Sequence, residues 1–266
     1  MGVAIVTGAG SGIGRAVAAR LAQMGHTLVL AGRTAQTLEE TADLLRTAAG
    51  RSPANTSSPG SVLVVPADVS RSAEVARLVD ETMDEYSRVD IVFNGVGQAP
   101  MIPTSAVTPE QWRQILDVNL SSAFYMTRAV WGIMERQHFE FNADHRGNPG
   151  ETPADRNAIT GGVIINVSSA AARDPFPGLG AYAVAKAGIN MLTQVTAREG
   201  EAIGIRVFCV APSGVETGMF RSLVSEEQVG TDDVLLPADV AETVGDMVNG
   251  GLRWASGEVV YVHRRM

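Results

Sequence analysis

Short apolar runs rich in β-branched residues alternate along the chain with longer segments whose apolar residues recur at helical spacing. The short runs cover residues 3–7, 27–31, 62–66, 90–94, 162–167, 206–211 and 258–262 and are typical of buried strands. The longer segments cover residues 15–24, 35–48, 72–86, 109–137, 182–202 and 237–249 and predict helices. This alternation predicts an α/β fold with a doubly wound, seven-stranded parallel sheet and helices on both faces.

Two stretches interrupt the alternation. Residues near 50–61 are rich in Pro, Ser, Gly and Asn, and residues 135–161 are charged and punctuated by Gly and Pro. Both are expected to be exposed loop insertions in a single domain spanning residues 1–266. We interpret them as solvated loops, with a substrate lid or a subunit contact as the alternative, because long ordered loops are often functional.

Composition and charge exclude several classes of partner. The net charge of -8 repels nucleic acid and anionic membrane surfaces, and no apolar run reaches the length of a membrane span. The chain enters its first strand without a signal-peptide pattern, so we expect a cytoplasmic protein without a membrane partner. Cys209, the one cysteine, cannot form an internal disulfide and is expected to be a buried thiol in a reducing compartment. We expect no metal site.

A glycine-rich string, TGAGSGIG at residues 7–14, follows the first predicted strand and opens a helix. Glycines at this place let the backbone approach a pyrophosphate, and the helix amides and dipole stabilise its charge. Taken alone, the string is also compatible with a tight strand-to-helix turn. The residues expected at the phosphates are Gly8, Ser11, Gly12, Ile13 and Gly14.

The ends of the second and third strands bear on which nucleotide binds. Arg33 and Thr34 stand where NAD-binding sites place an acidic residue on the ribose hydroxyls. Because the forked guanidinium of Arg33 suits a 2'-phosphate, NADP(H) is preferred and NAD(H) is the alternative. Asp68, with Val69 beside it, is expected to accept a hydrogen bond from the adenine amino group; the alternative is a cap for the helix that starts at Ser72.

Four polar residues in the middle of the chain are candidates for chemistry. Tyr182 and Lys186 are four residues apart, on one face of a helix, so the ammonium can lower the pKa of the phenol from its ordinary value of about 10. Ser169 follows a strand thirteen residues before Tyr182, and Asn119 lies inside a predicted helix, where Asn is disfavoured. Each residue alone has an ordinary structural explanation.

Together, these residues resemble the short-chain dehydrogenase/reductase family over nearly the whole chain. The string at 7–14, Asn119, Ser169, and Tyr182 with Lys186 follow the family's motifs in order, in the spacing of its compact branch, which includes 3-oxoacyl-carrier-protein reductases. The resemblance implies a single-domain Rossmann fold. It also implies that Tyr182 is the general acid/base, that Ser169 orients the substrate oxygen, that Lys186 lowers the pKa of Tyr182 and binds the nicotinamide ribose, and that Asn119 holds a relay water.

The resemblance also implies cofactor contacts beyond the glycine loop. These are Asn94 and Gly95 after the fourth strand, and Pro212, Val215 and Thr217 after the sixth. The family's N-N-A-G reads Asn94-Gly95-Val96-Gly97 here, its P-G reads Pro212-Ser213, and its acidic C-terminal ending is replaced by His263-Arg264-Arg265. The segment between Thr217 and Leu236, where relatives build a substrate lid, is short.

We therefore expect an NADP-dependent oxidoreductase that transfers a hydride between nicotinamide and a small carbonyl or secondary alcohol substrate. The alternative within enzymes is a 3-oxoacyl-carrier-protein reductase, which the acidic Glu199 and Glu201 and the negative net charge disfavour, since carrier proteins are acidic. The alternative from another class is a catalytically silent NADP-binding regulator. A homo-oligomer, dimer or tetramer, is expected through the helices that hold Asn119 and Tyr182. The physiological substrate and the reaction direction stay open.

Overall fold

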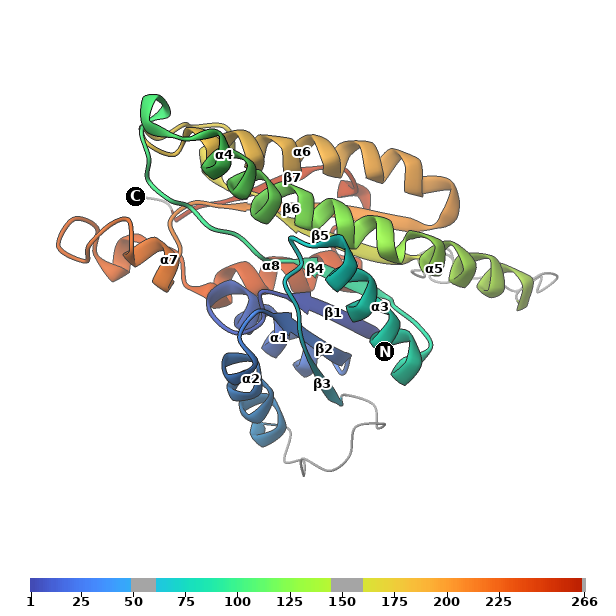
Figure 1. The fold of residues 1–266 in the computed structure, drawn as a ribbon. Helices are drawn as coiled ribbons and strands as arrows, with labels where there is room; N and C mark the ends of the chain where they lie inside the picture. Colours follow the sequence, from blue (N-terminus) through green and yellow to red (C-terminus); the bar gives the residue numbers. More distant parts are fainter. Residues whose placement is uncertain (49–60, 145–159, 265–266) are drawn as a thin grey trace.

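The computed structural model describes residues 1–48, 61–144 and 160–264, which fold around one seven-stranded parallel sheet (Figure 1). The strand order is β3-β2-β1-β4-β5-β6-β7, and every neighbouring pair is parallel. The strands are β1 (Val3–Thr7), β2 (Thr27–Gly32), β3 (Val62–Pro66), β4 (Ile91–Asn94), β5 (Gly162–Val167), β6 (Ile205–Pro212) and β7 (Val259–Val262). The fold is therefore the doubly wound, single-domain Rossmann fold that the sequence predicts.

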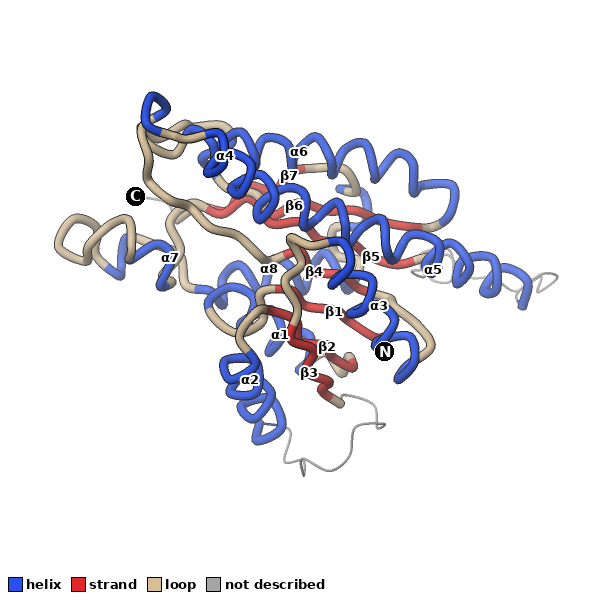
Figure 2. Tube along the Cα trace, viewed as in Figure 1, coloured by secondary structure: helices blue, strands red, loops and turns tan. Residues whose placement is uncertain are grey.

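Helices cover both faces of the sheet, as the ribbon and the tube show (Figures 1 and 2). The helices are α1 (Gly12–Gln23), α2 (Ala35–Ala48), α3 (Ser72–Tyr86), α4 (Pro109–Leu116), α5 (Ser122–Asp144), α6 (Gly180–Gly200), α7 (Gly218–Arg221) and α8 (Pro237–Asn249). One face packs against α1, α2 and α8, and the other against α3, α5 and α6. Successive residues of a strand alternate between the two cores: Val6 belongs to the first and Ile5 to the second.

The long helix expected over residues 109–137 is interrupted. Helix α4 ends at Leu116, a π-helical turn covers Asp117–Ser121, and α5 starts at Ser122. Periodicity did not reveal the break because a π-turn adds a residue without ending the helix. The side chain of Asn119, in this turn, accepts and donates hydrogen bonds outside its own helix.

The expectation of a loop over residues 135–161 is wrong for the first part of this segment, because helix α5 continues to Asp144. Side chains of residues that the sequence assigned to this loop form hydrogen bonds that hold the end of α5 beside the starts of β4 and β5. The Gln137 amide donates to the Val89 and Gly161 carbonyls at 2.9 and 3.1 Å, and it accepts from Val89 N at 2.9 Å. A hydrogen bond of 2.7 Å joins His138 and Thr160. The rest of this segment, at 145–159, and the predicted loop at 50–61, apart from Ser61, lie outside the described residues.

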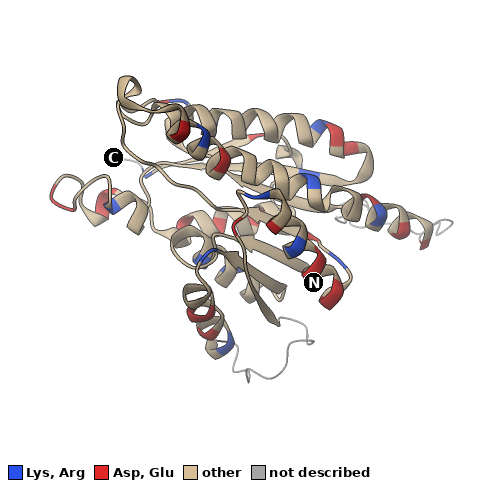
Figure 3. Ribbon diagram, viewed as in Figure 1, with Lys and Arg blue, Asp and Glu red and all other residues tan. Residues whose placement is uncertain are grey.

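Charged residues lie mainly on the helices and loops, and the strands are almost free of them (Figure 3). In the described part of the chain, no helix has both the length and the apolar character needed to cross a bilayer.

Candidate active site

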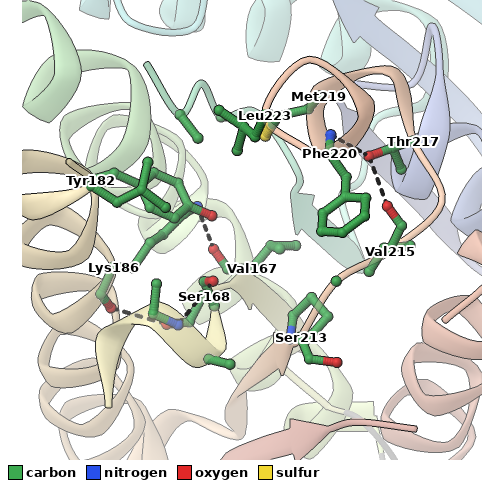
Figure 4. A pocket seen from close by; sticks show the side chains of 18 of the residues that line it. Val167, Ser168, Tyr182, Lys186, Ser213, Val215, Thr217, Met219, Phe220 and Leu223 are labelled. Carbon is green, nitrogen blue, oxygen red and sulfur yellow. Dashed lines mark hydrogen bonds between the residues drawn. The ribbon is translucent and has the colours of Figure 1, made fainter. Parts of the chain in front are cut away.

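Because all strands are parallel, their carboxyl ends and the segments that follow them meet at one edge of the sheet. A cleft of about 360 Å³ opens at this edge. Residues that follow β1, β4, β5 and β6 line it, together with residues of α6 and α7 (Figure 4). Tyr182 and Lys186 lie on one side, and Thr217 and Phe220 lie across from them. Segments far apart in the sequence thus form one cavity.

The glycine loop has the backbone that a phosphate site needs. Gly8 and Gly12 have φ of 70° and 50°, a region that disfavours side chains. A Cβ on Gly14 would collide with the Gly8 carbonyl oxygen, so only glycine lets α1 pack against this loop. Ser11 precedes α1, and its side chain makes no capping hydrogen bond. The first amides of α1 are therefore available to an anion.

Thr7 fixes this loop to the next segment of the site. Its buried hydroxyl donates to the Phe93 carbonyl at 3.1 Å and accepts from Gly95 N at 3.0 Å. The ends of β1 and β4 are thereby joined where Gly95 enters the cleft. The position of Thr7 at the start of the glycine string did not predict that its side chain joins the two strand ends.

The residues expected at the adenosine end lie after β2 and β3. Arg33 is exposed, and the pKa of Asp68 is lowered overall, with smaller contributions from the charges of Arg33 and Arg71. Burial acts against that shift, while hydrogen bonds from Ser70 favour the carboxylate. The Asp68 carboxylate accepts from Ser70 N and Oγ at 3.1 and 2.6 Å. This turn precedes α3, whose N-cap residue is Arg71, so Asp68 does not cap that helix.

Lys186 is almost entirely buried beside Tyr182. Its Nζ donates to the Val167 carbonyl at 2.8 Å and lies 5.6 Å from the centroid of the Tyr182 ring. Burial lowers the pKa of Lys186 to about 8. Ser168 locks the same helix to β5, because its hydroxyl donates to the Lys186 carbonyl at 3.0 Å. Sequence reasoning singled out Ser169 and missed this role of its neighbour.

Tyr182 and Ser169 both line the cleft, and their side chains interact. Burial raises the pKa of Tyr182, and a hydrogen bond from Ser169 lowers it. The balance is upward, although the nearby ammonium was expected to lower this pKa. The Ser169 hydroxyl oxygen accepts from Ala171 N at 3.2 Å, so its proton can be donated to another acceptor.

The π-turn brings Asn119 toward the lysine. The Asn119 amide donates to the carbonyls of Gln98 and Ile115, each at 2.9 Å, and accepts from Gln98 N at 3.1 Å. A Cβ on Gly97 would lie 3.0 Å from Asn119 Oδ1 and 3.6 Å from Lys186 Nζ. Gly97 therefore lies between the two side chains and leaves room beside both.

A buried polar chain below the cleft was not anticipated. Asn94 donates to Asn166 at 2.9 Å, and Asn166 donates to Thr193 at 2.9 Å, which links β4, β5 and α6. Asn94 Oδ1 is buried without a hydrogen-bond partner among the described residues. The sequence could have indicated this chain, because each of two apolar strands contains one Asn, but we predicted a role for Asn94 alone and not for Asn166.

The segment after β6 closes the far side of the cleft. Thr217 caps α7, accepting from Phe220 N at 3.2 Å and donating to the Val215 carbonyl at 3.1 Å. A Cβ on Gly12 would lie 3.1 Å from Thr217 Cγ2, so the glycine loop and this segment are neighbours. Pro212, Val215 and Thr217 all line the cleft, as their proposed cofactor role requires.

An apolar wall completes the cleft, and sequence reasoning did not assign it. Its side chains come from the segments after β4, after β5 and after β6: Met101, Phe176, Leu179, Met219, Phe220 and Leu223. The Met and Phe residues near α7 were the available signal. Without the fold, nothing distinguished them from residues of the core.

The residues present fit a nicotinamide dinucleotide. The uncapped start of α1 and the glycine loop can hold the pyrophosphate, and the buried Asn94 Oδ1 lacks a donor within the described chain. Nothing comparable suggests a metal: in the ranges that the structure covers, no three His, Cys, Asp or Glu side chains are arranged to hold an ion.

The chain is similar to known proteins over most of its length. A family model described as short chain dehydrogenase matches residues 2–139 and 156–228. A short-chain type dehydrogenase/reductase of Picea abies is 32% identical, with 98% of this chain and 90% of the relative covered. A short chain dehydrogenase/reductase of Aspergillus oryzae is 35% identical, with 84% and 75% covered.

Solved structures agree with these relatives. Levodione reductase superimposes with a TM-score of 0.82 at 25% identity, covering 98% of this chain and 95% of the other. A 3-ketoacyl-(acyl-carrier-protein) reductase from Brucella melitensis, complexed with NADH, superimposes with a TM-score of 0.80 at 26% identity, covering 98% and 96%. The chain therefore belongs to the short-chain dehydrogenase/reductase family of NAD(P)(H)-binding oxidoreductases.

Proposed function

We propose that this protein is an NADP(H)-dependent carbonyl reductase or alcohol dehydrogenase that acts on a small molecule. The observation that carries the proposal is the convergence of Ser169, Tyr182 and Lys186 on one largely apolar cleft beside the glycine loop. A proton donor, an oxygen-orienting hydroxyl and a buried cation are the groups that reduction of a carbonyl requires.

When bound, the nicotinamide supplies or accepts the hydride. Tyr182 donates a proton to the substrate oxygen in reduction and removes it in oxidation, and the Ser169 hydroxyl orients that oxygen. Lys186 supports the phenolate by its charge and binds the ribose hydroxyls. Asn119, held by Gln98 beside Lys186, positions a water for proton return. The apolar wall keeps bulk water from the reacting atoms, which strengthens each of these interactions.

Arg33 supports the preference for NADP(H). Among the described cations near this site, Arg33 has no ion pair within 4.0 Å, whereas Arg15 is bound to the carbonyl of Gly10 and to Thr41. An exposed guanidinium without a salt-bridge partner suits a 2'-phosphate. Asp68 and Val69 would hold the adenine, and Thr34 would lie at the ribose.

The catalytic assignment is tested by the oxidation of NADPH with a panel of ketones and one 3-oxoacyl thioester. Tyr182→Phe is expected to lower kcat by roughly a hundredfold to ten-thousandfold while NADPH binding is retained. Tyr261→Phe is the matched control, because it removes a phenol that does not line the cleft. Tight NADPH binding by the wild type without turnover of any substrate would support the silent regulator instead. Turnover of the thioester alone would support the carrier-protein reductase.

The cofactor assignment is tested by measuring the affinities for NADPH and NADH in Arg33→Ala. We expect weaker NADPH binding, by about tenfold or more, and little change for NADH, because a guanidinium–phosphate bond is charge-assisted and is lost with the side chain. Arg71→Ala is the control, since it also removes a cation close to Asp68. An unchanged ratio of the two affinities in Arg33→Ala rules out this role.

We also propose that the protein is a homo-oligomer that associates through α5 and α6. Large apolar side chains are exposed on these helices, among them Phe124, Val184 and Met191. Exposed apolar surface that gathers on adjoining helices is typical of a protein interface.

A further inference from the structure

The cleft that receives the proposed substrate has an unusual distribution of charge. Among the described residues that line it, Asp174 and Lys186 alone carry a formal charge at neutral pH. The Lys186 ammonium is buried, is bound to the Val167 carbonyl and is assigned to the cofactor ribose. Asp174 is therefore the charge that remains for the substrate.

The Asp174 carboxylate is exposed and has no ion-pair partner within 4.0 Å in the described ranges. The neighbouring Arg173 does not neutralise it, because its guanidinium stacks 4.2 Å from the centroid of the Tyr261 ring and does not line the cleft. Arg221, on the opposite segment, is paired with Glu216. Asp174 is thus the one unpaired carboxylate among the described residues that line the cleft.

The rest of the wall is apolar and partly uncovered. Met101, Phe176 and Met219 expose 51%, 64% and 41% of their surface around the cleft. The segments that carry Met101 and Phe176 are joined by a hydrogen bond of 2.8 Å from Ile102 N to the Gly178 carbonyl. These walls are therefore held together as a preformed surface that a compact apolar body would cover.

We propose that the substrate is a compact apolar ketone or secondary alcohol that carries a cationic amine, and that Asp174 is the residue that selects this charge. This inference rests on the proposed function of the same site. The apolar body packs on the Met and Phe side chains, the oxygen points to Tyr182 and Ser169, and the ammonium reaches the carboxylate at the mouth. A substrate with a carboxylate or phosphate meets Asp174 as a like charge.

The test uses three acetophenones that differ at the para position: aminomethyl, ethyl and carboxymethyl. We expect kcat/KM for NADPH-dependent reduction to fall from the amine to the neutral ketone to the acid, by about fivefold at each step, as for a solvent-exposed charge pair. Asp174→Asn is expected to remove this order, so that the amine and the acid are reduced with similar kcat/KM. Glu227→Gln, which removes an exposed charge from the segment after α7 but does not line the cleft, keeps the order.

A second measurement separates this inference from the proposed function. Calorimetry gives the affinity of each ketone for Tyr182→Phe loaded with NADPH, a complex in which the chemistry is blocked. The same order of affinities, lost when Asp174→Asn is added, supports the charge selection. This holds even if the wild type reduces none of the three ketones, because that result would contradict the proposed activity alone. Equal affinities for the amine and the acid, or an order that survives Asp174→Asn, overturn the inference.

Discussion

Lys186 is the only lysine of the sequence, and the fold buries it. Burial lowers its pKa from 10.5 to about 8. Between these two values the unfolded chain binds more protons than the folded chain. The free energy of unfolding therefore rises with pH across this window, and the penalty for the buried charge is present in full below it.

We predict that the stability of the cofactor-free protein, relative to Lys186→Met, rises by about 3 kcal/mol in total between pH 8 and pH 10.5. Urea denaturation of both proteins across this range measures the difference. Because the chain has one lysine, labelling of lysine with ¹³C also gives a single side-chain signal whose titration reports the pKa directly. A difference in stability that does not change with pH, with a titration near 10.5, would contradict the prediction.

Among the structural elements, the segment that follows β6 depends on one arginine. Arg221 on α7 binds Glu216 through its fork and donates to the Val229 carbonyl at 2.7 Å. The base of the segment is closed by the backbone bond from Glu216 N to the Leu235 carbonyl at 2.8 Å. Both contacts hold Glu216, and Thr217 follows it directly, so they help to position a residue that lines the cleft.

Arg221→Ala is predicted to raise KM for the ketone several-fold and to lower kcat less. The side chains proposed for proton transfer at Tyr182 are retained, while the segment that follows β6 becomes less ordered. Arg221→Lys, which keeps the charge without the fork, should lie between the alanine variant and the wild type. Steady-state kinetics measures both constants, and Arg77→Ala, which breaks the exposed pair with Glu81, is the control. A loss confined to kcat would show that Arg221 does not act through the covering segment.

The sequence predicts most elements because each has a local signal. Strands β1, β3 and β5 and helices α2, α3 and α8 have the predicted bounds. The π-turn at Asn119 was not predicted, because the hydrogen bonds of Asn119 go to the backbone of Gln98, which belongs to a distant segment. Short α7 was missed because four residues give no periodicity.

The residues of the site also fall into those that the sequence predicts and those that only the fold brings together. Ser169, Tyr182 and Lys186 have characteristic spacing in the sequence, and the structure brings them to one cleft. The apolar wall and the Asn94–Asn166–Thr193 chain come from residues that meet only when the sheet forms. The pKa of Tyr182 also depends on burial, which spacing alone does not predict.

At the scale of the whole molecule, α6 presents an apolar stripe to the outside. Val184, Met191 and Val195 are 51%, 58% and 43% exposed, and their spacing places them on one face of the helix. Phe124 on α5 is 46% exposed as well. In the ribbon, α5 and α6 run side by side along one face of the sheet (Figure 1).

We predict that Met191→Glu combined with Val195→Glu dissociates the oligomer, because two buried carboxylates at an interface have no partner. Analytical ultracentrifugation measures the mass, and we expect the variant to sediment as the monomer. Phe139→Glu changes an equally exposed apolar residue at the other end of α5 and serves as the control. A wild-type protein that sediments as a monomer would exclude association through this stripe.

The buried ammonium has a thiol as its neighbour. Cys209, the only thiol of the chain, lies on β6 beneath α6; burial raises its pKa to about 11, and the charge of Lys186 lowers it. The chain thus places its only amine side chain and its only thiol in the same small region of the interior. A thiol-selective reagent reacts with buried Cys209 only when α6 separates from β6, and its reaction rate reports how often this opening occurs. The chain therefore carries a natural label that reports, without any engineering, how often the helix under the cleft separates from the sheet.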